Sequence, residues 1–266
     1  MKICMMSLTM GNTPVEEIVS TALACKMEGI DWITTHGEKA SYLRKLCDDN
    51  GLYIAAHTMI KWGFIKREEN YFDEFKASLD DACVLGAPIL MLPPFPRENQ
   101  ISLEDDRKYY TEYYAKAYEL ASKAGVTLTL ESTGFYNSPI TTADECLEVL
   151  RQVPGLKVTY DQGNVATADD PCEAFLKLRD YVVHFHVKDW HISEQPCEKH
   201  TLKRDGRYYG DITIGEGDMD IRKFWRLTND RERQLYVNPE TQDYTGKRSS
   251  LEVFKQVCAE MRSWEE

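Results

Sequence analysis

Val126-Thr-Leu-Thr-Leu-Glu131 is an apolar, β-like stretch that ends in a carboxylate. Three later stretches have the same form, with an acidic residue or a histidine at the end. They are Leu156-Lys-Val-Thr-Tyr-Asp161, Val182-Val-His-Phe-His186 and Leu235-Tyr-Val-Asn-Pro-Glu240. In a parallel barrel the carboxyl ends of all strands open onto one face, so these end residues would meet there although they are far apart in sequence.

Alternating strand and helix signals run along the whole chain and predict a (β/α)8 barrel, as a single domain over residues 1–266. Strands are expected near residues 2–8, 31–35, 52–58, 88–92, 126–131, 156–161, 182–187 and 234–240. No linker rich in Pro, Gly or Ser divides the chain. No glycine-rich nucleotide turn follows the first strand, which argues against a doubly wound open sheet.

Helix ends are marked by short motifs. Helix starts are expected where a capping residue stands three positions before an acid, at Thr13, Ser102, Thr142 and Asp170. Helix stops are expected at glycines that lead into the next strand, namely Gly29, Gly51, Gly86 and Gly125. The spacing of these signals indicates that helices begin just after strand ends.

Composition and charge exclude several classes of function. The 266 residues are 42% hydrophobic and carry a formal net charge of -12, without a run of Lys or Arg. Nucleic acid is therefore not an expected partner. No stretch approaches about 20 uncharged apolar residues, and the N-terminus does not resemble a signal peptide, so we expect no membrane association and a cytoplasmic location. The eight cysteines contain no C-x-x-C pair and are expected to be reduced core thiols.

The four strand-end residues Glu131, Asp161, His186 and Glu240 together offer one imidazole and three carboxylates. This set is rich in hard oxygen donors, which suits Mn²⁺, Mg²⁺ or Co²⁺ and tolerates Zn²⁺. We therefore expect one divalent metal ion, with Mn²⁺ as the first choice and the other three open. A single acidic residue after a strand is about as often a helix N-cap or an ion-paired loop residue. Four at equivalent positions favour a site.

Several motifs resemble those of the xylose-isomerase-like barrel superfamily and, more narrowly, its sugar-phosphate isomerase/epimerase branch. They are Glu131-Ser-Thr-Gly134, Tyr160-Asp-Gln-Gly-Asn164, His184-Phe-His-Val-Lys-Asp189, Gly215-Glu-Gly-Asp218 and Asn238-Pro-Glu240. The resemblance covers nearly the whole chain. It places Glu131, Asp161, His186 and Glu240 at the metal-ligand positions of ketose 3-epimerases and inosose dehydratases.

The resemblance also implies an activity. Glu131 and Glu240 would be the catalytic acid/base pair that moves a proton next to the carbonyl of a ketose or keto-sugar, through a metal-stabilised enediolate. Which of the two is the base stays open, because like charges that share a metal push their pKa values apart in either direction. Proteins of this branch often pair or form tetramers, so a homo-oligomer is a further expectation.

Four other residues are predicted to bind substrate: His57, Asn164, Lys188 and Trp62. His57 ends a predicted strand and could reach a substrate hydroxyl, or be an ordinary buried histidine. Asn164 stands three residues after Asp161, where many relatives carry a histidine. Lys188 could offer a point charge to an oxyanion, or form a salt bridge. Trp62 could pack against a sugar ring or only cap the barrel mouth.

The segment from Trp190 to Gly215 is too long for an ordinary strand-to-helix loop and contains Lys203, Arg204 and Tyr209. We expect either a lid that supplies a cation or phenol to the substrate, or a solvated or dimer-contacting excursion. The glycine-rich stretch Ile214-Gly-Glu-Gly-Asp218 is expected to be the turn that enters the seventh helix.

Three alternatives to an isomerase or epimerase stay open. The same metal site could expel a β-hydroxyl, as in inosose dehydration, without any change of residues. An apurinic endonuclease of the same barrel type needs three zinc ions and more histidines, whereas this chain has six in all and carries Asn164 at one expected position. A barrel kept only as a binding scaffold is disfavoured by the complete ligand set.

Overall fold

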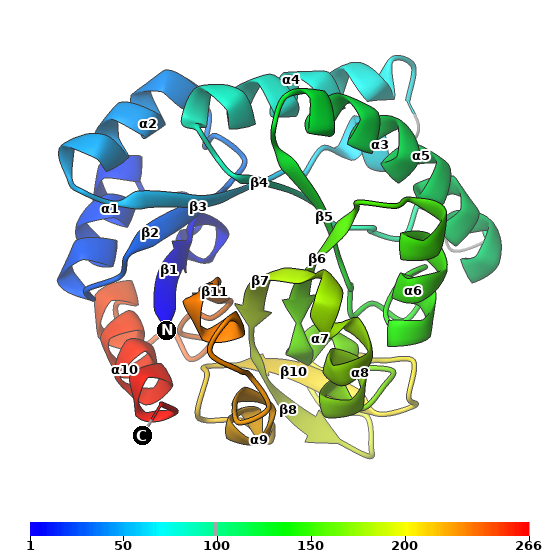
Figure 1. Cartoon of the computed structure of the whole chain (residues 1–266). Helices are drawn as coiled ribbons and strands as arrows, with labels where there is room; N and C mark the ends of the chain where they lie inside the picture. Colours follow the sequence, from blue (N-terminus) through cyan, green and yellow to red (C-terminus); the bar gives the residue numbers. More distant parts are fainter. Residues whose placement is uncertain (67, 98–100, 266) are drawn as a thin grey trace.

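The computed structural model describes residues 1–66, 68–97 and 101–265. Eight parallel strands close into a barrel, and helices surround it (Figure 1). The strands are β1 (Lys2–Met6), β2 (Gly29–Ile33), β3 (Tyr53–Thr58), β4 (Ile89–Leu92), β5 (Thr127–Glu131), β6 (Lys157–Asp161), β7 (Val182–Val187) and β11 (Tyr236–Pro239). They follow chain order around the barrel, and β11 closes it between β7 and β1. The predicted (β/α)8 barrel is confirmed.

The helices pack their apolar faces against the outside of the barrel. They are α1 (Val15–Ala24), α2 (Ala40–Asp49), α3 (Trp62–Ile65), α4 (Tyr71–Leu85), α5 (Leu103–Lys123), α6 (Ala143–Gln152), α7 (Gln162–Val165), α8 (Pro171–Leu178), α9 (Ile221–Trp225) and α10 (Ser250–Ser263), with 3-10 turns η1 (Ser7–Met10), η2 (Arg179–Tyr181) and η3 (Glu232–Gln234). In the part of the chain that is described, no helix has the length and apolarity of a membrane span.

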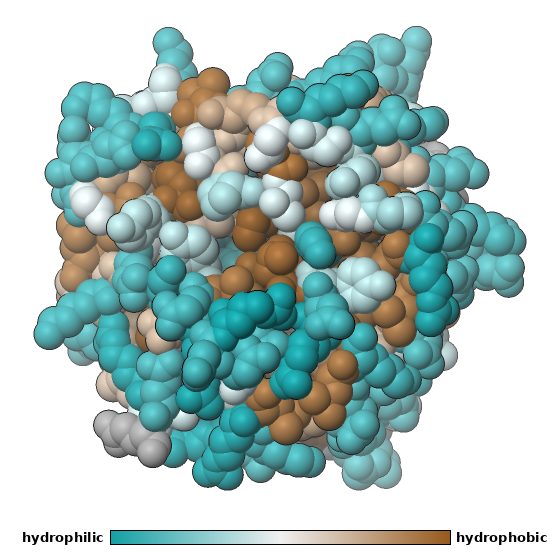
Figure 2. All heavy atoms as spheres, in the orientation of Figure 1, coloured by the Kyte–Doolittle hydropathy of each residue, from teal (hydrophilic) through white to brown (hydrophobic). Residues whose placement is uncertain are grey.

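Side chains divide by polarity between core and surface. In α4 the buried stripe includes Phe75, Leu79 and Ala82, as its helical spacing predicts. In the orientation of Figure 1, hydrophilic side chains of the outer helices form most of the rim, and a group of hydrophobic side chains lies near the centre (Figure 2). Six of the eight cysteines are buried and free, whereas Cys83 and Cys197 are free but exposed.

Most of the predicted helix ends are confirmed. Ser102, Thr142 and Asp170 each accept a backbone N–H as side-chain caps, and Gly51, Gly86 and Gly125 have positive φ. The predictions at Thr13 and Gly29 are wrong. The Thr13 hydroxyl donates to Met10 O instead of capping a helix, and α1 begins after Pro14 without a side-chain cap.

Gly29 is the second wrong prediction, because it belongs to β2 and its φ is not positive. The left-handed residue after α1 is Lys26, with φ 54°. A Cβ at Gly29 would collide with the backbone carbonyl of Tyr53 on the neighbouring strand. Glycine is needed there for close strand approach and not for a turn.

The segment expected to be a long loop or lid is largely a small antiparallel sheet beside the barrel, in the order β8-β10-β9 (Figure 1). Its strands are β8 (Asp189–Ser193), β9 (Thr201–Leu202) and β10 (Tyr208–Ile212). The turn between β9 and β10 is fixed to the barrel helices. Arg204 donates two hydrogen bonds of 2.8 Å to the carboxylate of Glu145 in α6, and Asp205 N–H donates to Thr167 O at 3.1 Å. These contacts hold the turn of the sheet against the barrel.

Two of the sequence motifs, His184–Asp189 and Gly215–Asp218, contact each other at the start of this sheet. The Asp189 carboxylate accepts N–H groups from Gly215, Gly217 and Met219 at 3.0–3.1 Å. A Cβ at Gly217 would overlap the Asp189 carboxylate, so only glycine permits this approach. The turn then leads into α9, whose N-cap is Asp220, as the sequence predicted. The Gly-rich stretch thus anchors the sheet that follows His186 and Lys188.

Candidate metal centre and active site

The structure brings the four predicted strand-end residues together. Glu131 ends β5, Asp161 ends β6, His186 is next to last in β7, and Glu240 directly follows β11. These strands are neighbours in the barrel, and Asp161 is directly in register with His186. One ligand atom from each of the four residues lies within 4.8 Å of all the others. The cluster therefore has the compactness that a single metal ion requires.

The contact between Glu131 and His186 fits a shared cation. Glu131 Oε1 and His186 Nδ1 lie 2.6 Å apart, yet both atoms are buried without a hydrogen bond in the described chain. Ligand atoms of one ion are neighbours at roughly 3 Å, because each lies about 2.1 Å from the metal. Two buried ligand atoms that face each other at such a separation without a hydrogen bond are what a divalent ion would bind.

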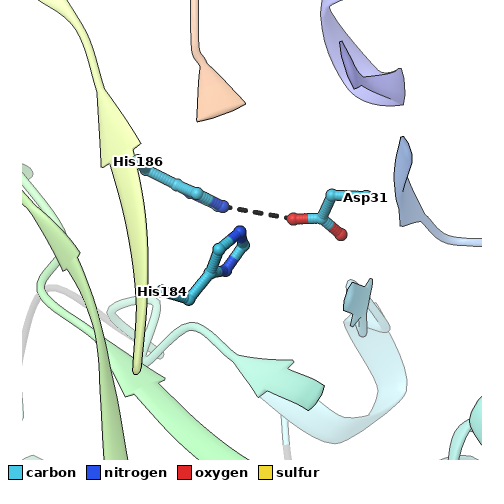
Figure 3. Close-up of side chains that lie close together, drawn as sticks. All are labelled: Asp31, His184 and His186. Carbon is cyan, nitrogen blue, oxygen red and sulfur yellow. Dashed lines mark hydrogen bonds and ion pairs between the residues drawn. The ribbon is translucent and has the colours of Figure 1, made fainter. Parts of the chain in front are cut away.

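Asp31 is a residue of this site that sequence reasoning missed. It lies in β2, fully buried inside the barrel, with its Oδ2 3.2 Å from His186 Nε2 (Figure 3). Asn238 Nδ2 donates to the same oxygen at 2.8 Å, and Thr58 Oγ1 donates to Oδ1 at 3.2 Å. A proton on Nε2 then faces a carboxylate, which leaves the lone pair of Nδ1 for a metal. The only sequence signal was an acid within the apolar stretch Gly29–Ile33.

His184 lies beneath His186 on β7, and both rings point into the barrel from the same strand (Figure 3). Burial, followed by the neighbouring His186, lowers the pKa of His184 to about 4. This imidazole is therefore neutral. Asp31, His184 and His186 could themselves group around a metal, but His186 Nε2 is already paired with Asp31.

Electrostatics favour an added positive charge at the cluster. Burial raises the pKa of Asp161 to about 7, the carboxylates of Glu240 and Glu131 add to the rise, and Lys188 opposes it. Burial alone would lower the pKa of His186, but Glu131 and Asp31 on its two sides raise it above the usual value. Three carboxylates close together are unfavourable without a counter-charge. A divalent cation would supply it.

Two of the predicted substrate residues lie at the cluster and line the cavity above it. Asn164 donates its backbone N–H and its Nδ2 to the two carboxylate oxygens of Asp161, at 2.9 and 3.1 Å. Lys188 Nζ lies 2.6 Å from Glu240 Oε1 and 3.5 Å from Asp161 Oδ2. In this arrangement Asn164 orients Asp161, and Lys188 is ion-paired. Burial alone would raise the pKa of Glu240, but the ammonium group of Lys188 holds this pKa below its usual value.

The structure does not bring the other two residues to the cluster. His57 is buried, with its Nδ1 2.8 Å from Trp32 O, and it borders a separate small pocket beside Ser78 and Asp81. Side chains alternate along a strand, so its neighbour Thr58 faces the cavity instead. Trp62 is 62% exposed and stacks on Phe95, which borders the cavity. Their binding roles stay predictions.

A cavity of about 480 Å³ opens above the cluster, a size typical of small-molecule sites. One side is formed by the loops after β4 and β5, including Phe95 and Phe135. The other side is formed by the small sheet, which contributes Trp190, Lys203 and Tyr209. The segment expected to be either a lid or a solvated or dimer-contacting excursion thus supplies one wall of the cavity.

A closed barrel of eight parallel strands, with carboxylates and an imidazole grouped at the strands' carboxyl ends, defines a (β/α)8 barrel with a candidate metal centre. The family model described as xylose isomerase-like TIM barrel matches residues 21–263, and the chain belongs to this family. The resemblance to this superfamily is thereby confirmed. No curated protein sequence matches the chain significantly.

Solved structures share the fold over nearly the whole chain. The 3-keto-D-glucoside 4-epimerase YcjR from E. coli has a TM-score of 0.76 at 16% identity, covering 99% of both chains. The IOLI protein with a bound zinc atom has a TM-score of 0.77 at 15% identity, covering 99% of this chain and 98% of the other. The probable 3-DHS dehydratase AsbF from Bacillus anthracis has a TM-score of 0.72 at 17% identity, covering 98% and 99%. At these identities the likeness establishes the fold.

Proposed function

We propose that the protein is a divalent-metal-dependent isomerase or epimerase that transfers a proton next to the carbonyl of a ketose or keto-sugar. The main observation is the pair Glu131 and Glu240 at one cavity, on strands separated by β6 and β7. Sugar epimerases are among the structures that share the fold. Two carboxylates that approach from different strands suit removal and return of a proton on opposite faces of one carbon.

Glu131, Asp161, His186 and Glu240 would hold the metal, with Mn²⁺ as the first choice. When bound, a divalent cation stabilises the negative charge that develops on the carbonyl oxygen as the neighbouring carbon loses its proton. The environments of the two glutamates differ, because Glu240 is ion-paired with Lys188 whereas Glu131 Oε1 faces His186 Nδ1 at 2.6 Å. This difference suits two groups with separate acid and base roles.

The remaining residues at the cluster position these groups. Asn164 keeps the Asp161 carboxylate in place through two hydrogen bonds. Asp31 holds the His186 ring from its far side. The cavity walls of Phe95, Phe135 and Trp190 limit the access of water to the carbon that loses its proton.

The test is deuterium incorporation from heavy water, measured by NMR over a panel of ketoses, keto-sugars and inososes with added Mn²⁺. We expect label at one carbon with the wild-type protein and none with Glu131→Gln or Glu240→Gln. Glu104→Gln, an exposed glutamate on α5, is the matched control and should exchange normally. Exchange retained by Glu240→Gln, with its circular dichroism spectrum unchanged, would contradict the assignment.

A dehydratase is the second candidate, and the fold shared with the probable 3-DHS dehydratase AsbF favours it. The same glutamate would remove the proton, and the partner acid would protonate a departing β-hydroxyl, so that water leaves. Mass spectrometry of the products separates the two reactions. Loss of one water identifies a lyase, whereas an unchanged mass identifies an isomerase or epimerase.

A further inference from the structure

Lys203 is a cation at the cavity that has no acidic partner among the described residues. The residue directly follows β9, is 7% exposed and borders the cavity. Its Nζ lies 5.2 Å from the ring centre of Trp190 and 5.7 Å from that of Phe135. Within residues 1–66, 68–97 and 101–265, no hydrogen bond or ion pair joins this Nζ to another group. Lys188, in contrast, is paired with Glu240.

An unpaired cation at this depth is energetically unfavourable. Burial of a charge is costly unless the charge is paired, and a contact with an aromatic face returns only about 0.5–2 kcal/mol. Consistent with this, burial lowers the pKa of Lys203 to about 8, with a further contribution from Lys188. A lysine that had only a structural role at this turn could point into solvent.

The backbone around Lys203 is held in place. Its N–H donates to Arg207 O at 2.9 Å, and Gly206 N–H donates to its carbonyl at 3.1 Å. The next residue, Arg204, is fixed to α6 by its two hydrogen bonds with Glu145. The side chain is therefore presented to the cavity by a turn that is anchored on both sides.

The acidic groups of the metal cluster already have partners other than Lys203. The carboxylates of Glu131, Asp161 and Glu240 would be balanced by one divalent ion together with Lys188, and the Asp31 carboxylate lies against His186. Asp211 also borders the cavity, and it acts on Lys203 electrostatically but forms no ion pair with it within the described residues. Lys203 is therefore a positive charge on the wall of the cavity that has no ion-pair partner among the described residues.

We propose that Lys203 binds a negatively charged group of the substrate, a carboxylate or a phosphate at a distance from the reacting carbonyl. This inference rests on the proposed function, in which the carbonyl end of the same substrate lies at the metal cluster. It defines the substrate class as acidic keto-sugars. Lys188 and Lys203 both lie over the ring of Trp190, at 5.3 and 5.2 Å from its centre. Both ammonium groups thus lie beside the same indole ring, so the proposed anion site adjoins the metal cluster.

The test compares three sugars that differ only at carbon 6: D-fructose, D-fructuronate and D-fructose 6-phosphate. Their affinities are measured by isothermal titration with the Mn²⁺-loaded and the chelator-treated protein. We expect at least one acidic sugar to bind ten-fold or more tightly than D-fructose in both forms. The carboxylate and phosphate arms identify which anion the site prefers.

Three variants test whether Lys203 is responsible for the preference for acidic sugars. Lys203→Met should lower the affinity for the acidic sugar to that for D-fructose, whereas Lys203→Arg should retain most of the preference. Lys116→Met changes the net charge equally at an exposed position on α5 and should have no effect. Equal affinities of the wild-type protein for all three sugars, or a preference that persists in Lys203→Met, would overturn the inference.

The two proposals fail in different ways. Binding of acidic sugars that depends on Lys203, without deuterium exchange in any sugar tested, would count against the proposed function alone. Exchange in neutral ketoses, without preference for an acidic group, would count against the role of Lys203 alone.

Discussion

The carboxylate of Asp31 lies 3.2 Å from Nε2 of His186, on the side of the imidazole opposite Glu131. Asp31 belongs to β2, which is separated from β7 by β1 and β11, so the contact crosses the interior of the barrel. Burial opposes ionisation of Asp31, but the hydrogen bond from His186 lowers its pKa below the usual value. An ionised Asp31 thus positions His186 for a metal.

The first prediction concerns this positioning. Asp31→Asn should weaken Mn²⁺ affinity about 10- to 100-fold, as is typical when a residue that orients a metal ligand is replaced. Competition titration against a metal-sensitive dye measures the affinity. Asp230→Asn, at an exposed position, is the control and should bind metal normally. An Asp31→Asn protein with unchanged affinity would show that His186 does not need this partner.

Metal stoichiometry gives a second prediction. We expect one divalent ion per chain by elemental analysis, because the described residues form one four-residue ligand group, and the other possible group, Asp31 with His184 and His186, shares His186 with it. Free Mn²⁺ at about 100 times its dissociation constant should stabilise the folded state by about 2.7 kcal/mol. Chelation should remove both the ion and the stabilisation. Three ions per chain would instead favour the endonuclease alternative.

A third prediction concerns the wall of the cavity. Arg204→Ala should lower the free energy of unfolding by about 1–3 kcal/mol, because it removes two hydrogen bonds to a largely buried carboxylate. Urea denaturation measures the change. Arg226→Ala, at an exposed position directly after α9, should be close to neutral. Equal stability of the two variants would mean that the small sheet is held by other contacts.

The fourth prediction is a pH dependence. Lys203 binds an anion only when protonated, and burial lowers its pKa to about 8, while Lys188 and Asp211 are the charged groups that act on it. Affinity for D-fructuronate should therefore be full below pH 8 and fall as pH rises through this value. Lys203→Arg should remove the fall, because guanidinium stays charged. An equal fall of affinity in the wild-type protein and in Lys203→Arg would show that a group other than Lys203 titrates.

His57 and Thr58 show why sequence reasoning found only part of the site. The strand containing both was predicted, but a period of two means that one residue faces the cavity and its neighbour faces the helices. The structure places Thr58 toward the cavity. A pattern of apolar residues on both sides of a buried strand does not reveal which face is which.

The barrel and the grouping of Glu131, Asp161, His186 and Glu240 could be predicted from the amino-acid sequence, because both depend on local signals. Apolar runs, capping residues and glycines recur along the chain, and parallel strands necessarily bring their carboxyl ends to one face. Three relationships became visible only in the folded chain: Asp31 supports His186, Asp189 anchors the Gly215–Gly217 turn, and Lys203 borders the cavity without an ion-pair partner among the described residues. These relationships join residues that are distant along the chain, and they depend on strand register and side-chain direction.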